Sequence, residues 1–209
     1  MLFQEFHKIP RLSHGIVITE KIDGTNAQVF IVDKDVTHID ISGDDFKGSE
    51  SLLIAEKDNF LMFAGSRNKW ITPQDDNYGF AGWCQRNADA LFTLGEGHHF
   101  GEWWGLGIQR RYNQTEKKFS LFNTGRWISP NKETGLVPIL PSCVGLVPVL
   151  YTGPFDQGQI TATLDYLESM GSVAAPGFKP AEGIVIYHAA ARMYFKKTIL
   201  NDEKAKSQE

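Results

Sequence analysis

Short apolar runs, separated by turn-forming residues, follow one another along most of the chain. Runs of this length and spacing predict β-strands joined by turns. The first two runs, residues 15–19 and 27–32, flank a polar stretch at residues 20–26. The later runs predict strands at residues 51–56, 60–64, 98–104, 118–122, 144–151, 182–188 and 192–197.

Two segments have the apolar spacing of helices instead. The first follows residues 72–77 and runs from Phe80 to Leu94, with Gly95 as its end. The second has apolar residues at helical spacing between an aspartate cap and a terminal glycine: Ile160, Leu164 and Leu167, with Asp156 before them and Gly171 after.

The remaining segments predict connections. Residues 33–50 are polar and rich in Gly and Asp, residues 123–143 contain three prolines, and the tail at 201–209 is polar. Pro148 places its strand at a sheet edge or a bulge, because proline lacks an amide hydrogen. Because strands dominate and helices are few, we expect one α+β domain over residues 1–209, built on antiparallel sheets.

Composition supports a globular protein and limits its partners. The 209 residues are 42% hydrophobic and 22% charged. A net charge of −4 argues against coating nucleic acid by bulk electrostatics, although a local basic groove is compatible with it. The basic residues that could line such a groove are Arg67, Lys69, Arg110, Arg111, Lys117, Lys118, Lys196 and Lys197.

The cysteines and the N-terminus suggest a location. Cys84 and Cys143 have neither the spacing of a zinc site nor that of a disulfide framework, which favours a reducing cytoplasm. No apolar run is long enough to cross a membrane, and residues 1–8 do not form a signal peptide. We therefore expect a cytoplasmic protein with no membrane partner.

The chemistry centres on Lys21, which ends the first apolar run beside Glu20 and Asp23 and just before Gly24. A lysine amine at a strand end beside a glycine turn can reach into a cleft and attack phosphorus. Its free pKa of about 10.4 would have to fall for this, through burial or cationic neighbours. The alternative is an ordinary surface hairpin with Asp23-Gly24 as its turn.

Five further stretches offer what nucleotidyl transfer through a lysine would need. The reaction needs cations at the phosphates, a carboxylate at the ribose, an aromatic face for the base and acids for a metal. Taken singly, each candidate residue has a simpler structural explanation, such as an acid on the surface or a phenylalanine in the core. Jointly they favour catalysis: Arg67 for a phosphate or a strand end, Glu102 for the ribose, Phe122 for the base, Glu182 for the metal, and Lys196 and Lys197 for the α-phosphate.

In their order along the chain, these stretches resemble the six sequence elements of the covalent nucleotidyltransferases, which include polynucleotide ligases and mRNA capping enzymes. The resemblance spans residues 20–198. Its elements are Lys21-Ile22-Asp23-Gly24, Ser66-Arg67-Asn68, Gly101-Glu102, Phe119 to Phe122, Glu182-Gly183 and the lysines at Lys196.

Within that superfamily, residues 20–26 look most like ATP-dependent RNA ligases of the phage nick-sealing and trypanosome editing type. This type usually has histidine where the chain has Asp23, whereas aspartate is usual in DNA ligases and capping enzymes. The last element is often lysine–any–lysine, but its third place here is Thr198 and the second lysine is Lys197. The resemblance implies an ATP-grasp-like ligase adenylation domain with a central nucleotide cleft, and we expect no appended oligonucleotide-binding domain.

The resemblance also implies a mechanism and a set of site residues. Lys21 would attack ATP and hold AMP, AMP would pass to a 5′-phosphate end, and a 3′-hydroxyl would displace it. The partners would be ATP, Mg²⁺ or Mn²⁺, and RNA (possibly DNA), bound by a monomer in the cytoplasm, or in the host cytoplasm if a phage encodes the chain. The residues implied are Lys21, Lys196 and Lys197 for catalysis; Glu20, Ile22, Asn26, Arg67, Glu102, Phe122 and Lys196 for the nucleotide; and Glu182 and Asp23 for the metal.

Two alternatives remain open. The same chemistry could act on another acceptor, as in a DNA ligase or a GTP-dependent capping enzyme. The chain could also be a binding module for nucleotide or nucleic acid that kept the cleft without the reaction.

Overall fold

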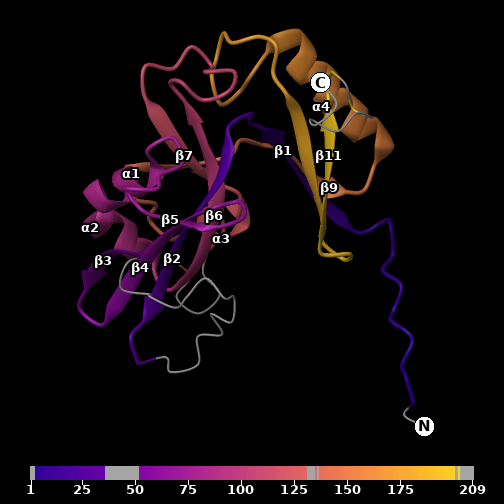
Figure 1. Ribbon diagram of the computed structural model, residues 1–209. Coiled ribbons are helices and arrows are strands. Elements are labelled where there is room, and N and C mark those ends of the chain that lie inside the picture. Colours follow the sequence, from indigo (N-terminus) through magenta and orange to yellow (C-terminus); the bar gives the residue numbers. More distant parts are fainter. Residues whose placement is uncertain (1–2, 36–51, 131–134, 136, 201, 203–209) are drawn as a thin grey trace. The chain divides into compact units, whose positions relative to one another are not determined.

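The computed structural model describes residues 3–35, 52–130, 135, 137–200 and 202 (Figure 1). The chain forms two compact units, one from Met1–Ile22 together with Pro148–Glu209 and the other from Asp23–Val147. The boundary therefore falls one residue after Lys21 and again at Pro148. The prediction of a single domain over residues 1–209 stays a prediction.

The described part of the first unit contains a four-stranded antiparallel sheet in the order β11-β10-β1-β9. Its strands are β1 (Gly15–Lys21), β9 (Val149–Pro154), β10 (Gly183–His188) and β11 (Met193–Thr198). Alternate residues of β1 and β10 are apolar and buried, so these two central strands share one buried face.

Helix α4 (Gln157–Met170) covers that buried face, as Figure 1 shows. The carboxylate of Asp156 caps it by accepting hydrogen bonds from the amides of Gly158 and Gln159, and Gly171 ends it with a positive φ. Both predicted ends of this helix are confirmed. The core between helix and sheet consists of Ile16, Ile18, Ile160, Leu167, Ala181, Ile184 and Ile186.

The second unit contains a seven-stranded, mostly antiparallel sheet in the order β3-β4-β2-β6-β7-β8, with β5 paired to β4. Only β7 and β8 run parallel among these described strands. The strands are β2 (Thr25–Asp33), β3 (Leu53–Lys57), β4 (Phe60–Ser66), β5 (Trp70–Ile71), β6 (Gly97–Gly105), β7 (Lys117–Leu121) and β8 (Val144–Leu146).

One face of this sheet packs against helices in a large apolar core that includes Val29, Phe80, Trp103 and Phe119. The predicted helix from Phe80 to Leu94 is present but interrupted. It consists of α1 (Phe80–Arg86), α2 (Ala88–Leu91) and the 3₁₀ helix η3 (Phe92–Leu94), with Asn87 breaking the first two apart and Gly95 ending the last at a positive φ.

Three other local predictions need correction or completion. The predicted strand at 144–151 divides at Pro148 into β8 and β9, which belong to different sheets, because proline cannot donate a ladder hydrogen bond. The irregular segment 123–143 contains a short helix, α3 (Thr124–Ile128), and β5 was not predicted. Most of the predicted connection at 33–50 lies outside the described residues, as does the tail at 201–209 apart from residue 202.

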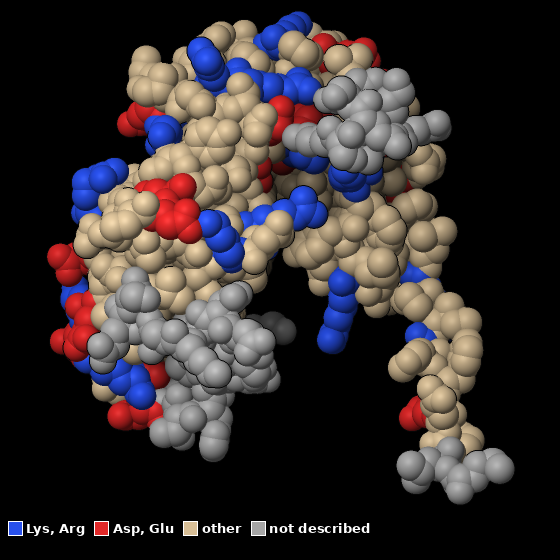
Figure 2. All heavy atoms as spheres, viewed as in Figure 1, with Lys and Arg blue, Asp and Glu red and all other residues tan. Residues whose placement is uncertain are grey.

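The predicted α+β class built on antiparallel sheets is confirmed. Acidic and basic side chains are interspersed over the face of the protein in Figure 2, in keeping with the small net charge of −4. Among the described helices, none has the length and apolar character needed to span a bilayer.

Candidate active site

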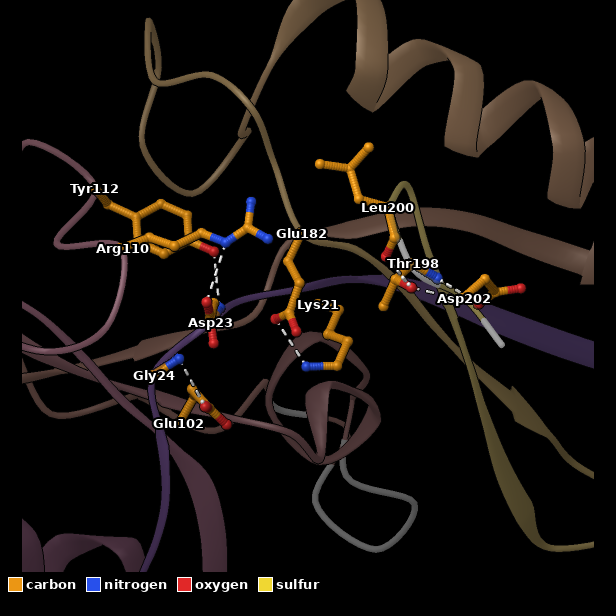
Figure 3. A network of polar contacts seen from close by, with 10 residues as sticks. All are labelled: Lys21, Asp23, Gly24, Glu102, Arg110, Tyr112, Glu182, Thr198, Leu200 and Asp202. Carbon is orange, nitrogen blue, oxygen red and sulfur yellow. Dashed lines mark hydrogen bonds and ion pairs between the residues drawn. The ribbon is translucent and has the colours of Figure 1, made fainter. Parts of the chain in front are cut away.

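Lys21 ends β1, and its amine forms an ion pair with Glu182 just before β10 (Figure 3). The distance from Lys21 Nζ to Glu182 Oε2 is 2.7 Å. The lysine side chain is 20% exposed, whereas that of Glu182 is only 4% exposed. The lysine side chain is therefore partly open to solvent, whereas its carboxylate partner is buried in the protein.

Gly183 explains how Glu182 reaches Lys21. By strand alternation Glu182 would lie on the face of the sheet that carries Ile184, which is covered by α4. Gly183 has a φ of +154°, a conformation that side-chain-bearing residues rarely adopt, and a Cβ there would lie 2.2 Å from the carbonyl oxygen of Lys197. The glycine thus interrupts the alternation and permits the Glu182–Lys21 contact.

Sheet register places Lys196 on the same face as Lys21. Lys21 pairs with Gly183 and Gly183 pairs with Thr198, while Lys196 pairs with Val185 two residues along β10. Directly paired residues and residues two apart share a face of an antiparallel sheet, so Lys21, Lys196 and Thr198 share one.

Lys197 lies on the opposite face of β11, in register with the buried Ile184. Its amine is 3.2 Å from Asp202 Oδ2, with which it forms an ion pair. Sequence alone left open which of the two adjacent lysines is directed at a phosphate. The register favours Lys196, because Lys197 points to the side of the sheet that carries α4.

Glu20, predicted to bind nucleotide, has a buried carboxylate that is engaged within the first unit. It accepts hydrogen bonds from Ser172 Oγ at 2.5 Å and from the amides of Val173 and Ala174 at 2.9 and 2.8 Å. Burial raises the pKa of this carboxyl, and these three donors partly offset the rise. Ile22 is also buried. Any contact of these two residues with a nucleotide stays a prediction, and the Glu20 carboxylate is already used to anchor the loop after α4.

In the second unit, Asp23 is held by two residues that the sequence did not identify as part of the site. Arg110 Nε donates to Asp23 Oδ2 at 3.0 Å, and the amide of Asp23 donates to the hydroxyl of Tyr112 at 2.7 Å (Figure 3). Tyr112 is fully buried and packs edge-on against Trp104. Gln109, Arg111, Tyr112 and Asn113 all have positive φ, which forms a tight loop around this contact.

Gly24 fits against β6 so closely that no side chain could replace its hydrogen. A Cβ at this position would lie 2.4 Å from the carbonyl oxygen of Trp103. The amide of Gly24 donates to Glu102 Oε1 at 3.0 Å, so the turn after the lysine is joined to the predicted ribose-binding carboxylate. A glycine is therefore needed at this position so that the turn after Lys21 can lie this close to β6.

The other predicted nucleotide-binding residues of the second unit line one face of its sheet. Asn26 pairs with Glu102, and Glu102 pairs with Ser120 across β2, β6 and β7. Phe122 lies just after the end of β7, two residues beyond Ser120, and is half-buried. Its amide donates a hydrogen bond to the carbonyl of Phe100. Phe119, by contrast, is buried in the core on the other face.

Arg67 lies apart from these strand residues, in the exposed turn between β4 and β5. This turn is held by Ser66, whose amide and hydroxyl both bond to the carbonyl of Lys69. Arg67 is thus available to solvent at the end of β4, where Ser66 pairs with Ala27.

The described residues contain no group of three or more His, Cys, Asp and Glu side chains placed to hold a metal ion. Glu182 and Asp23, the predicted metal ligands, are each engaged by a basic side chain, Lys21 and Arg110. A site with one carboxylate is still suitable for Mg²⁺, which keeps several waters and commonly takes its other ligands from substrate phosphates.

Comparison with solved structures supports the fold. A Naegleria gruberi RNA ligase mutant in its apo form is 20% identical, with 89% of this chain and 50% of that chain covered and a TM-score of 0.56. A mutant of that ligase with ATP and Mn is 17% identical, with coverages of 90% and 50% and a TM-score of 0.55. A third mutant, with AMP and Mn, is 18% identical, with coverages of 88% and 49% and a TM-score of 0.54. The chain spans about half the length of these ligases.

A search of curated protein sequences found no match. The sequence model of the RNA ligase family, however, matches residues 15–201. The chain belongs to the RNA ligase family. The match covers all six elements from which the resemblance was drawn. The predicted RNA ligase family is confirmed, whereas the phage nick-sealing and trypanosome editing type stays a prediction.

In this RNA ligase family member, the predicted residues fall into two groups. In the first unit Lys21 contacts Glu182 and shares a sheet face with Lys196, whereas Lys197 lies on the other face. The second unit brings together Asn26 and Glu102, with Phe122 on the same face, and leaves Arg67 in a turn. The two groups are joined directly in the chain at Ile22–Asp23.

Proposed function

We propose that this protein is an ATP-dependent RNA ligase that seals 5′-phosphate and 3′-hydroxyl ends through a lysyl-AMP intermediate. The observation that carries the proposal is the amine of Lys21, whose side chain is partly exposed and is held by Glu182 on the sheet face that also carries Lys196. Membership of the RNA ligase family supports the reaction class.

In the first step, Lys21 Nζ attacks the α-phosphorus of ATP. A phosphorus–nitrogen bond forms, the bond to the β-phosphate oxygen breaks, and pyrophosphate leaves with the electron pair. Lys196 would neutralise charge on the α-phosphate as it develops, because it projects from the same face as the attacking amine. Glu182 orients the amine through the ion pair and would accept its proton before attack, which leaves Lys21 Nζ with the electron pair that forms the new bond.

In the second and third steps, the nucleotide moves to RNA and is then expelled. A 5′-phosphate oxygen of RNA attacks the lysine-bound phosphorus, which forms a phosphoanhydride and releases Lys21. The 3′-hydroxyl then attacks the RNA phosphate, a phosphodiester forms and AMP leaves. Arg67, in its exposed turn, would hold the phosphate of an RNA end.

We assign the second unit to recognition of the nucleoside. Glu102 would accept hydrogen bonds from the ribose hydroxyls, and Phe122 would stack on adenine from the same face of the sheet. Asn26 lies beside Glu102 and would bind the nucleotide through its amide. We assign Asp23 to holding the lysine turn, because its carboxylate accepts from Arg110 and its amide donates to Tyr112, while its role as a metal ligand stays a prediction.

Glu182 is the residue that would hold a divalent cation, Mg²⁺ or Mn²⁺. Such a cation would supply positive charge at the phosphates during nucleotidyl transfer. The Mn-containing ligase structures with ATP and AMP support this choice of cofactor and nucleotide. The free cysteines Cys84 and Cys143 favour a reducing cytoplasm, where we expect the protein to act as a monomer.

The first step can be tested without RNA. Incubation with ATP and Mg²⁺ should add one AMP to the protein, as detected by intact-mass measurement, and peptide mapping should place it on Lys21. Lys21→Ala should abolish the adduct, Lys69→Ala, which removes an exposed lysine, should retain it, and EDTA should prevent it. Absence of any adduct while a known ligase reacts in the same buffer would refute the proposal.

The acceptor is tested separately, because Asp23 is the residue usual in DNA ligases and capping enzymes. The adenylylated protein should seal RNA ends faster than DNA ends of the same sequence, and ATP should be used in preference to GTP. Faster sealing of DNA would assign the protein to the DNA ligases. If the wild type and Lys21→Ala give the same background signal in the sealing assay while both bind nucleotide, the chain is a binding module.

A further inference from the structure

A series of near-parallel rings lies on the same face of the second unit's sheet as the proposed nucleoside site. Phe30 on β2 stacks on His98 on β6 with ring centroids 4.0 Å apart and planes 13° apart. His98 is followed on the same strand by Phe100, with centroids 5.5 Å apart and planes 7° apart. The three rings therefore share almost one orientation, which is the arrangement of a stacking surface.

Two of the three rings, His98 and Phe100, are open to solvent. Phe100 is 47% exposed and His98 is also exposed, although both carry flat rings that usually seek burial. The pKa of His98 is lowered by partial burial, so its ring is a neutral aromatic surface at neutral pH. Gln28 fixes the orientation of this ring, since Gln28 Oε1 lies 2.9 Å from His98 Nδ1.

Strand register makes this surface continuous with the nucleoside site. Phe100 lies two residues before Glu102 on β6, and Gln28 lies two residues after Asn26 on β2, so all four share a face. Phe122 is bonded through its amide to the carbonyl of Phe100 and faces the same side. The ring series therefore begins where the proposed nucleoside contacts end.

We propose that the Phe30–His98–Phe100 series is a stacking surface for a nucleobase of the RNA substrate. The inference rests on the proposed function and deepens it, by naming where a base of the RNA strand binds. A base is the occupant that the surface fits, because an exposed flat ring such as Phe100 accepts any nucleobase by stacking. Figure 2 shows charges of both signs interspersed over one face of the protein. Because such a surface does not attract RNA by charge alone, base stacking would add to the electrostatic part of RNA binding.

A basic side chain near this stacking surface is suited to the phosphate of the same RNA strand. Arg67 lies in the exposed turn after Ser66, which pairs with Ala27 beside Gln28. A strand whose base stacks on Phe100 could thus meet a cation for its phosphate on the same sheet. This pairing of an aromatic surface and a guanidinium is typical of single-strand recognition.

The test uses single-stranded RNA oligonucleotides that carry 2-aminopurine at successive positions from the 3′-hydroxyl end. Stacking on an aromatic side chain should quench the fluorescence at one of these positions with the whole protein. Phe100→Ala should remove the quenching and raise the Kd for RNA about 5- to 150-fold, the range for loss of one stacked base. Phe100→Trp, which keeps an aromatic ring, should retain both the quenching and the affinity.

Two controls separate this surface from general damage and from the nucleotide site. Tyr166→Ala removes a ring of similar exposure on α4 in the first unit and should not change RNA binding. The lysyl adduct formed from ATP alone should still appear with Phe100→Ala, because that step needs no RNA. The inference is overturned if Phe100→Ala binds RNA as the wild type does, or if Phe100→Trp is as weak as the alanine variant. Absence of an adduct in the wild type would instead refute the proposed function itself.

Discussion

Lys21 and Lys196 project from the same face of the four-stranded sheet, on the two strands that flank β10, whereas the neighbouring Lys197 projects from the other face. Two basic side chains on one face, with the carboxylate of Glu182 beside the first, are the groups that we propose attack and hold the phosphate. The alternation of side chains along β11 decides which of the two adjacent lysines lies on the same sheet face as Lys21.

The two lysines form a matched pair for mutagenesis. Lys196→Ala should slow formation of the lysyl adduct by about 100-fold or more, the usual loss when one group that stabilises developing charge is removed. Lys197→Ala should leave the rate close to that of the wild type and remove an exposed ion pair with Asp202. Quench-flow measurement of adduct formation with ATP checks both. The reverse order of effects would show that the register argument assigns the wrong lysine.

The contact between Asp23 and Arg110 should have a measurable coupling energy. Arg110→Ala leaves a largely buried carboxylate without this cation, and should cost about 1–3 kcal/mol of the free energy of unfolding. A double-mutant cycle with Asp23→Asn should give a coupling of about 0.5–3 kcal/mol in urea denaturation.

A positioning role for Arg110 predicts more than instability. At saturating ATP the rate of adduct formation should fall while the KM for ATP changes little, because the lysine turn is displaced and the nucleoside contacts are not. Lys69→Ala, which breaks an exposed ion pair with Asp75, should change neither quantity. Equal and additive effects of the Asp23 and Arg110 substitutions would contradict the assignment.

Gly24 and Gly125 should respond in opposite directions to alanine. A Cβ at Gly24 would lie 2.4 Å from the carbonyl oxygen of Trp103, so Gly24→Ala should cost about 1–3 kcal/mol and disturb the turn that follows Lys21. Gly125 lies in α3 with nothing within 4 Å of the added carbon, so Gly125→Ala should stabilise by about 0.5–1 kcal/mol. Thermal unfolding of both variants tests the prediction, and a neutral Gly24→Ala would refute the close approach.

His99 should make the second unit less stable in acid. Burial lowers the pKa of His99, whose Nε2 lies 2.8 Å from the carbonyl oxygen of Gly95. Because the folded pKa lies below the ordinary value of about 6.5, the stabilisation is complete above that pH and is lost as the pH falls through it towards the folded pKa. Urea denaturation between pH 7 and 5 should therefore show a steeper loss for the wild type than for His99→Gln. Parallel curves for the two proteins would exclude this contribution.

Sequence periodicity predicted the individual strands that carry the site, but it did not predict how these strands pair with one another. The alternation of buried residues in β1 and β10 follows from local pattern, and so does the helix α4 with its Asp156 cap and Gly171 end. The choice between Lys196 and Lys197 depends on which residues of β10 lie opposite, and register between strands is a tertiary property.

The contacts of Asp23 could not be predicted from the sequence. Arg110 is 87 positions away in the chain and appeared only as half of a basic pair, which is common on solvated surfaces. The positive φ angles of Gln109, Arg111, Tyr112 and Asn113 occur at residues that give no glycine-like signal. Pro148 did indicate an irregular strand, but only the folded structure shows that the strands on its two sides belong to different sheets.

The order of the strands has a consequence for synthesis of the protein. The sheet that presents Lys21 takes β1 from the start of the chain and β9, β10 and β11 from beyond Pro148, whereas the second unit is one continuous segment, Asp23–Val147. On the ribosome, that continuous segment can fold as soon as it has emerged, while β1 must wait for strands made more than a hundred residues later. A nascent chain therefore completes the sheet that carries Asn26 and Glu102 before Lys21 gains Glu182 as its neighbour.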